Sequence, residues 1–225
     1  HTASFDGALP LQRAAAAGIL APRTLLAHMT QVDDEWLAKV AATNASVVHC
    51  AESNLKLASG LCSISRMREA GINVALGTDG AASNDDLDML GELRTAALLD
   101  KLTASQSGLA ATTSAQMLTA ATLGGAKALG LGDVCGSLEV GKSADFIAVQ
   151  LNAAPVYDVI AHVVFVSSTC VTDTWVRGAR LVKNGVCTSA LLDEQRLRYE
   201  AVKWGAKIAV DADHIDSSGA VVGVD

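Results

Sequence analysis

The sequence has 225 residues, of which 50% are hydrophobic and 18% charged. A chain of this size and composition buries a sizeable core, which excludes a disordered or fibrous protein. Seventeen basic against twenty-four acidic residues give a net charge of −7, without a run of like charge, which argues against a surface that binds nucleic acid or an anionic membrane. No apolar stretch approaches the ~18 residues of a membrane span. These features predict a globular protein that acts on a small molecule.

The five cysteines are scattered at positions 50, 62, 135, 170 and 187. Their odd number and the lack of CxxC spacing fit neither a disulfide framework nor a zinc ribbon. Free cysteines behave most often as small buried hydrophobic residues, so we expect Cys50 and Cys62 to pack in a core. Free thiols also predict a reducing, cytoplasmic compartment. The sequence starts at His1 without a signal-peptide pattern, and this start need not be the native one.

The first half of the sequence repeats one strand–helix unit. Short apolar runs are each followed by helical spacing, with strands expected at 24–29, 46–50 and 72–79 and helices at 33–43, 63–70 and 86–102. Three such units in succession predict a parallel sheet with helices outside it. A further helix is expected over 114–131.

The periodicity changes near residue 133, where short β-branched runs separated by Gly or Asn begin. This pattern is typical of an antiparallel meander, and the segment HVVFVSS, which starts at His162, is expected to be one of its strands. We therefore divide the chain into a βα region at 1–132, a small β region at 133–189, and a terminal helix and tail at 190–225. Within the last region, an amphipathic helix is expected over 190–208.

Each of the three predicted parallel strands ends in a polar residue, namely His28, His49 and Asp79. In a (β/α)8 barrel, side chains at the carboxyl ends of strands line the mouth of the active site. A lone His in this position is more often structural, and an Asp-Gly pair is more often a turn or a helix cap. Alternatively, Asp79 in the string GTDGAASN binds a divalent metal or acts as a general acid/base. The coincidence of all three residues favours a site.

Four strings in matching order carry a resemblance to a known family, from about Pro10 to about residue 187. They read LLAHMTQVDDE, VVHCAESNLKLASG, NVALGTDGAASNDDLDMLGELRTAALL and GSLEVGKSADFIAV. They resemble the ATZ/TRZ branch of the amidohydrolase superfamily, in particular its 5′-methylthioadenosine/S-adenosylhomocysteine deaminases. The resemblance implies a metal-dependent (β/α)8 TIM barrel with zinc, or sometimes iron, at the strand ends. It also implies hydrolytic removal of the C6 amine from an adenosine-like nucleoside.

The resemblance also implies roles for the strand-end residues. Asp79 would coordinate the metal and take the proton of the attacking water, and His28 would hydrogen-bond the attacked centre or the metal-bound hydroxide. A divalent cation lowers the pKa of its bound water towards 7, which makes this chemistry possible at neutral pH. His28, Asp79 and His49 would all line the substrate site. Asn54 and Lys56, in SNLKLASG, are expected to hold the loop after the second strand without touching substrate.

Two patterns of the family are missing or incomplete. The HxH pair of the first barrel strand does not occur in this sequence. His1 lies roughly where a later HxxE strand would supply a metal-binding His, but Ser4 stands at the Glu position. A whole barrel takes ~250 residues, whereas three βα units are recognisable here. We interpret the chain as the carboxyl-terminal half of such a barrel, followed by strands of a small β-sandwich.

Such a half barrel is expected to be inactive alone. It would be completed by the missing amino-terminal half or would form a homo-oligomer. Two alternative functions remain: a related hydrolase of guanine, cytosine or a triazine, and a non-catalytic half-barrel scaffold. Metal content separates catalysis from scaffolding, because a catalytic protein retains close to one zinc per chain and a scaffold retains none.

Overall fold

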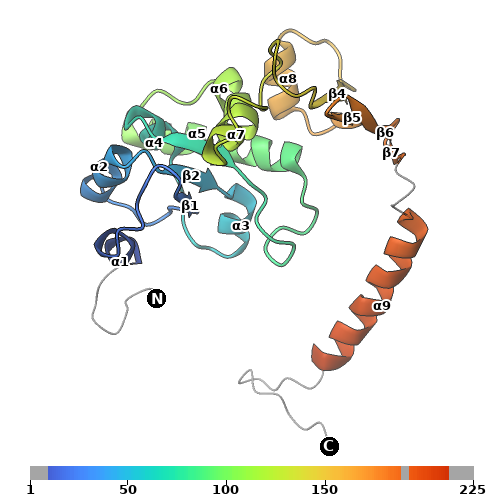
Figure 1. Ribbon diagram of the computed structural model, residues 1–225, viewed down its shortest axis with the longest axis horizontal. Helices are drawn as coiled ribbons and strands as arrows, with labels where there is room; N and C mark the ends of the chain where they lie inside the picture. The colour runs from blue at the N-terminus through green and yellow to red at the C-terminus, as the bar shows by residue number, and fades with distance from the viewer. Residues whose placement is uncertain (1–9, 189–192, 213–225) are drawn as a thin grey trace, which may run out of the picture.

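The parallel sheet predicted for the first half is confirmed. The computed structural model describes residues 10–188 and 193–212, and Figure 1 shows how its elements are arranged. Three strands, β1 (Leu25–Ala27), β2 (Ser46–His49) and β3 (Asn73–Leu76), form a sheet in the order β1-β2-β3. All pairings are parallel, and strands that are consecutive in the chain are neighbours in the sheet. The three carboxyl ends therefore lie at one edge of the sheet.

Helices follow the strands as the spacing predicts, with two additions. They are α1 (Pro10–Ala16), α2 (Asp34–Ala42), α3 (Ala51–Lys56), α4 (Ile64–Glu69), α5 (Met89–Ser107), α6 (Ser114–Thr119) and α7 (Gly125–Ala128), the last two joined by a π-helical turn, η1 (Ala120–Gly124). One addition is α1, where the sequence pattern gave no expectation of a helix. The other is α3, which corrects the expected loop after the second strand. Its N-cap residue, Cys50, makes no side-chain capping bond, so the local sequence carries no helix-start signal there.

The core lies between the parallel sheet and its helices. Val47 on β2, Ile64 on α4 and Leu93 on α5 are each at most 1% exposed, and they belong to one cluster of buried apolar residues. Gly124 brings η1 unusually close to β3, because a Cβ placed there would lie 2.4 Å from the carbonyl oxygen of Val74. Its own carbonyl accepts a hydrogen bond of 3.0 Å from the Asn73 side chain. The last helical segment is thus seated directly on the sheet.

The antiparallel meander is also confirmed. Its strands are β4 (Phe146–Gln150), β5 (Cys170–Val176), β6 (Ala179–Lys183) and β7 (Val186–Cys187), in the order β4-β5-β6-β7. The predicted strand at HVVFVSS is wrong, because its first four residues are the end of helix α8 (Val159–Phe165). The Asp158 side chain caps this helix by accepting a hydrogen bond of 2.8 Å from Ala161 N, and Val164 is fully buried in the core of the first region.

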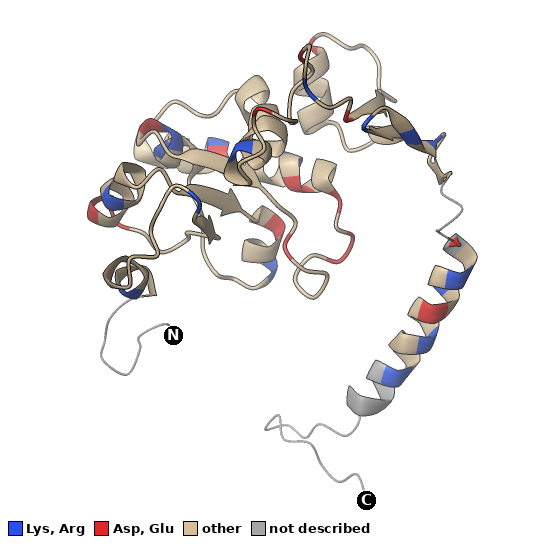
Figure 2. Cartoon of the chain, viewed as in Figure 1, with Lys and Arg blue, Asp and Glu red and all other residues tan. Residues whose placement is uncertain are grey.

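The predicted terminal helix is α9 (Glu194–Ala212), which runs away from the rest of the chain in Figure 1. Its ribbon in Figure 2 carries more of the blue that marks Lys and Arg than of the red that marks Asp and Glu, and Leu197 and Trp204 are more than half exposed. Among the described helices, none has the length and apolar character needed to cross a bilayer.

Candidate active site

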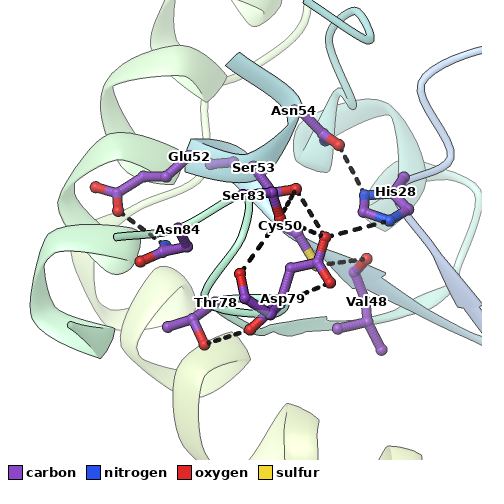
Figure 3. A network of polar contacts seen from close by, with 12 residues as sticks. His28, Val48, Cys50, Glu52, Ser53, Asn54, Thr78, Asp79, Ser83 and Asn84 are labelled. Carbon is purple, nitrogen blue, oxygen red and sulfur yellow. Dashed lines mark hydrogen bonds and ion pairs between the residues drawn. The ribbon is translucent and has the colours of Figure 1, made fainter. Parts of the chain in front are cut away.

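His28 and Asp79 come together at the carboxyl edge of the parallel sheet, as their positions in the sequence predict. His28 follows β1 and Asp79 follows β3, and His28 Nε2 lies 3.7 Å from Asp79 Oδ2 (Figure 3). This distance is within ion-pair range but too long for a hydrogen bond. Both residues have left-handed backbone, with φ of 69° and 64°. Non-glycine residues held in this conformation cluster at functional sites.

Asp79 is held by neutral donors. Its Oδ2 accepts hydrogen bonds from Ser53 Oγ at 2.7 Å and Ser83 Oγ at 3.1 Å, and its Oδ1 accepts from Gly80 N at 2.8 Å. These bonds, that of Ser53 above all, lower the pKa of the Asp79 carboxyl, since they favour the charged form. The side chain is 36% exposed. Asp79 is therefore an ionised carboxylate that is both oriented and accessible.

His28 is oriented by Asn54. The Asn54 Oδ1 lies 2.8 Å from His28 Nδ1, and an amide oxygen can only accept, so the proton of the neutral ring resides on Nδ1. The second ring nitrogen, Nε2, is thereby left as an acceptor on the side of Asp79. Hydrogen bonding of one imidazole nitrogen to fix the role of the other is the usual arrangement in catalytic and metal-ligating histidines.

Sequence reasoning missed Ser53 and gave Asn54 a different role. Both lie on α3, are at most 2% exposed and contact the two predicted site residues directly. Asn54 was expected to hold a loop; instead it holds His28. Lys56 pairs with Asp85 through a contact of 2.5 Å and, among the described residues, forms no hydrogen bond or ion pair with His28 or Asp79. The only sequence feature that could have indicated these two residues is their position shortly after the second strand. It is the helical backbone of α3 that directs Ser53 towards Asp79 and Asn54 towards His28.

His49 does not join this network. It is 1% exposed, and neither ring nitrogen has a hydrogen-bond partner in the described chain. Burial lowers its pKa to about 4, so the ring is neutral at physiological pH. Its role in lining the substrate site stays a prediction. His1, the other candidate ligand, lies outside the described residues.

Cys50 and Cys62 pack in the core, as expected, with 4% and 2% exposure. Burial raises the pKa of Cys50 to about 11 and that of Cys62 to about 12. Both thiols are therefore protonated at neutral pH, whereas a metal ligand or nucleophile is a thiolate.

The described residues provide only part of a metal site. Over 10–188 and 193–212, no three His, Cys, Asp or Glu side chains gather in a metal-binding arrangement, whereas catalytic zinc takes three protein ligands and a water. The Asp79 carboxylate and the His28 imidazole are nevertheless suitable donor types. The chemistry of this pair fits a metal whose remaining ligands come from elsewhere.

Comparison with known proteins supports this interpretation. A 5-methylthioadenosine/S-adenosylhomocysteine deaminase of Teredinibacter turnerae is 44% identical over 206 residues, which cover 90% of this chain and 46% of the relative. The crystal structure of an adenosine deaminase from Xanthomonas campestris with bound zinc superposes with a TM-score of 0.83 at 40% identity, and the match covers 92% of this chain and 47% of that one.

A more distant neighbour is an atrazine chlorohydrolase from Arthrobacter aurescens complexed with zinc, with a TM-score of 0.78 and 28% identity over 88% of this chain and 44% of that one. The chain thus spans about half the length of the relatives it matches, and its parallel sheet is part of a TIM barrel. The amidohydrolase family model matches residues 4–181, and the chain belongs to this family.

Proposed function

We propose that the chain supplies the carboxyl-terminal half of a zinc-dependent deaminase that removes the amine from adenosine-like nucleosides such as 5′-methylthioadenosine and S-adenosylhomocysteine. The observation that carries the proposal is Asp79, an accessible carboxylate held by Ser53 and Ser83 beside the acceptor nitrogen of His28. The names of the relatives give the substrate class. Iron in place of zinc stays a prediction.

Each of the two residues has a defined task in this proposal. Zinc, when bound, would lower the pKa of a water molecule and so supply the nucleophile. Asp79 would be one of the ligands and would take the proton of the attacking water for delivery to the departing amine. His28, whose Nδ1 proton is committed to Asn54, would accept a hydrogen bond through Nε2 from the attacking water. The left-handed backbone conformation of His28 and Asp79 fixes the direction in which each side chain leaves the main chain.

The remaining ligands would come from an upstream half barrel that pairs with β1. Among the described strands, β1 has a neighbour on one side only, and free strand edges invite pairing. A groove of about 1190 Å³ runs along this side, lined by Pro10, Leu11, Leu25, Met29, Trp36 and neighbouring residues. The mainly apolar lining, which includes residues of helices α1 and α2, suits packing against the next strand–helix unit of a completed barrel, and a second copy of the chain is the alternative occupant.

A chimera tests the proposal. The chain is joined to the amino-terminal half of the Teredinibacter turnerae relative, and ammonia release from 5′-methylthioadenosine and S-adenosylhomocysteine is followed together with zinc content. We expect the chimera to retain close to one zinc and to turn over, and the 225-residue chain alone to show little or no activity. The chimera carrying Asp79→Asn is the matched control.

Other outcomes assign the alternatives. A folded, zinc-loaded chimera that hydrolyses a triazine or guanine but no adenosine-like nucleoside would favour a related hydrolase, as the atrazine chlorohydrolase neighbour suggests. A folded chimera that retains no zinc would favour the scaffold. Nucleoside salvage in the cytoplasm is the cellular role that we propose along with the activity.

A further inference from the structure

Glu92 is a fully buried carboxyl group that the proposed reaction does not use. It lies in the first turn of α5 and is 0% exposed. Its Oε1 accepts a hydrogen bond from Ala51 N, and its Oε2 accepts from Glu52 N at 3.3 Å and from the Asn84 side chain at 3.4 Å. Burial raises its pKa to about 7. A carboxyl group kept in so costly a position needs an explanation.

The two backbone donors belong to the first turn of α3, the helix without a capping bond from its own N-cap residue. The first N–H groups of a helix have no partner within it, and a buried helix end without partners is unfavourable. Glu92 satisfies two of these groups from 40 residues away. Its carboxyl group therefore fixes where α3 begins at the end of β2.

Helix α3 in turn holds both candidate site residues. Ser53 donates to Asp79, and Asn54 accepts from His28, so a movement of α3 displaces both contacts together (Figure 3). Glu92 itself touches neither His28 nor Asp79. We infer that Glu92 is a positioning residue: it anchors α3, and through Ser53 and Asn54 it sets the orientation of Asp79 and His28.

The chain contains a matched control on the same helix. Asp100, also on α5 and 1% exposed, accepts hydrogen bonds from Ser65 N at 2.6 Å and Thr112 N at 2.7 Å, and Ser65 lies in the first turn of α4. Asp100 thus accepts a hydrogen bond from an N–H group in the first turn of α4, as Glu92 does in the first turn of α3. Since no residue of α4 hydrogen-bonds to His28 or Asp79, loss of Asp100 is expected to destabilise the fold without reorienting the site.

The first test is made on the 225-residue chain and needs no enzymatic activity. Nitrogen-15 NMR of the histidine rings reports which nitrogen of His28 carries the proton and how fast the Nδ1 proton exchanges with solvent. We expect the unmodified chain to show the Nδ1–H form. Glu92→Gln, in which an amide N–H₂ replaces one acceptor, should give mixed forms and exchange at least ~10-fold faster, whereas Asp100→Asn should leave His28 unchanged.

A double variant tests whether Glu92 acts on His28 through Asn54. If Glu92 acts through Asn54, Glu92→Gln changes nothing further at His28 in an Asn54→Ala background, because coupled substitutions are not additive. An unchanged His28 in Glu92→Gln, or equal changes at His28 in Glu92→Gln and Asp100→Asn, would overturn the inference. Should Glu92→Gln fail to fold, Glu92→Asp, which is one methylene shorter, takes its place in the same measurements.

The second test rests on the proposed function and uses the chimera. Glu92→Gln should lower kcat by ~10-fold or more with KM within ~3-fold, since misplaced reacting groups lose rate rather than binding. Asp100→Asn should change kcat by no more than ~2-fold at a matched loss of thermal stability. An inactive chimera with an intact effect at His28 would reject the proposed function and leave the positioning role standing; equal kcat losses in the two variants would reject the positioning role.

Discussion

The two sheets of this chain each hold an aspartate whose pKa is lowered, but in opposite ways. Asp79, at the end of the parallel sheet, is stabilised by the hydroxyl of Ser53 and other neutral donors and is 36% exposed. Asp173, in the antiparallel sheet, is stabilised by the Arg180 guanidinium, and its side chain is 11% exposed. Hydroxyl and amide donors hold a carboxylate without cancelling its charge, whereas a guanidinium cancels it. Asp79 therefore keeps an anionic charge available for a cation, and Asp173 does not.

The surroundings of the two sheets differ in the same sense. The parallel sheet is covered by helices, and Val47 at its centre is 0% exposed. In the antiparallel sheet, Phe146, Ile147 and Val186 are between 38% and 59% exposed. The first region contains its own core around the site, and the second offers apolar surface to a neighbour.

The difference between Asp79 and Asp173 is tested most strongly by making the same substitution, Asp to Asn, at each position in the chimera. Asp79→Asn keeps the shape of the side chain but removes its charge and its proton acceptor, so turnover should fall by ~10³-fold or more, and zinc content should drop. Asp173→Asn should lower the melting temperature because it leaves Arg180 without its anion, at unchanged turnover per folded molecule. Steady-state rates and thermal melts distinguish the two; comparable turnover losses would contradict the assignment.

A histidine pair gives the next largest effect. His28→Ala should lower turnover by ~10²-fold while leaving the fold cooperative. His162→Ala removes a buried ring from α8, far from the catalytic edge in sequence, and should lower the melting temperature with little effect on turnover. If His28→Ala mainly lowers the melting temperature, the ring is structural.

The exposed sheet predicts self-association of the 225-residue chain. Ile147 lies on β4, whose described neighbour is β5 alone, and it is 50% exposed. Ile147→Lys should shift the chain towards monomer in sedimentation velocity, because a charged edge disfavours strand pairing. Leu102→Lys, at a residue with 49% exposure on helix α5, is the control that should not. A monomeric unmodified chain would remove the basis of this prediction.

The smallest effect is a pH dependence of stability with two opposed parts. The pKa of Glu92 is raised from 4.5 to about 7, so the native state binds the extra proton and stability falls as pH rises through this window. The pKa of His49 is lowered from 6.5 to about 4, so the unfolded state binds the extra proton and stability falls as pH decreases from 6.5 to 4.

Each part is expected to amount to about 1–3 kcal/mol. Glu92→Gln should remove the loss on the alkaline side and leave a stability that only rises with pH, as measured by urea unfolding between pH 4 and 8. A profile that Glu92→Gln does not alter would show that this carboxyl group titrates normally.

Most of the fold was predictable because its signals are local. Apolar runs followed by helical spacing marked the parallel strands and their helices, and the position of Asp79 and His28 at strand ends followed from the same pattern. Helix α3 was not predicted because the carboxyl group that accepts hydrogen bonds from its first N–H groups belongs to Glu92, which lies 40 residues further along the sequence. The residues at 159–165 are β-branched and apolar, as in a strand, but capping by Asp158 and burial of Val164 make them a helix.

The close seating of Gly124 on the Val74 carbonyl has a consequence for how the two regions move. Any side chain at this position would collide with backbone, so even Gly124→Ala would push η1 off the sheet. The connection from the half barrel to the meander, residues 129–145, starts at the end of α7, so the absence of a side chain at Gly124 sets how close to the sheet this connection begins. The chain therefore leaves the half barrel for the meander from a helical segment that is packed against the parallel sheet.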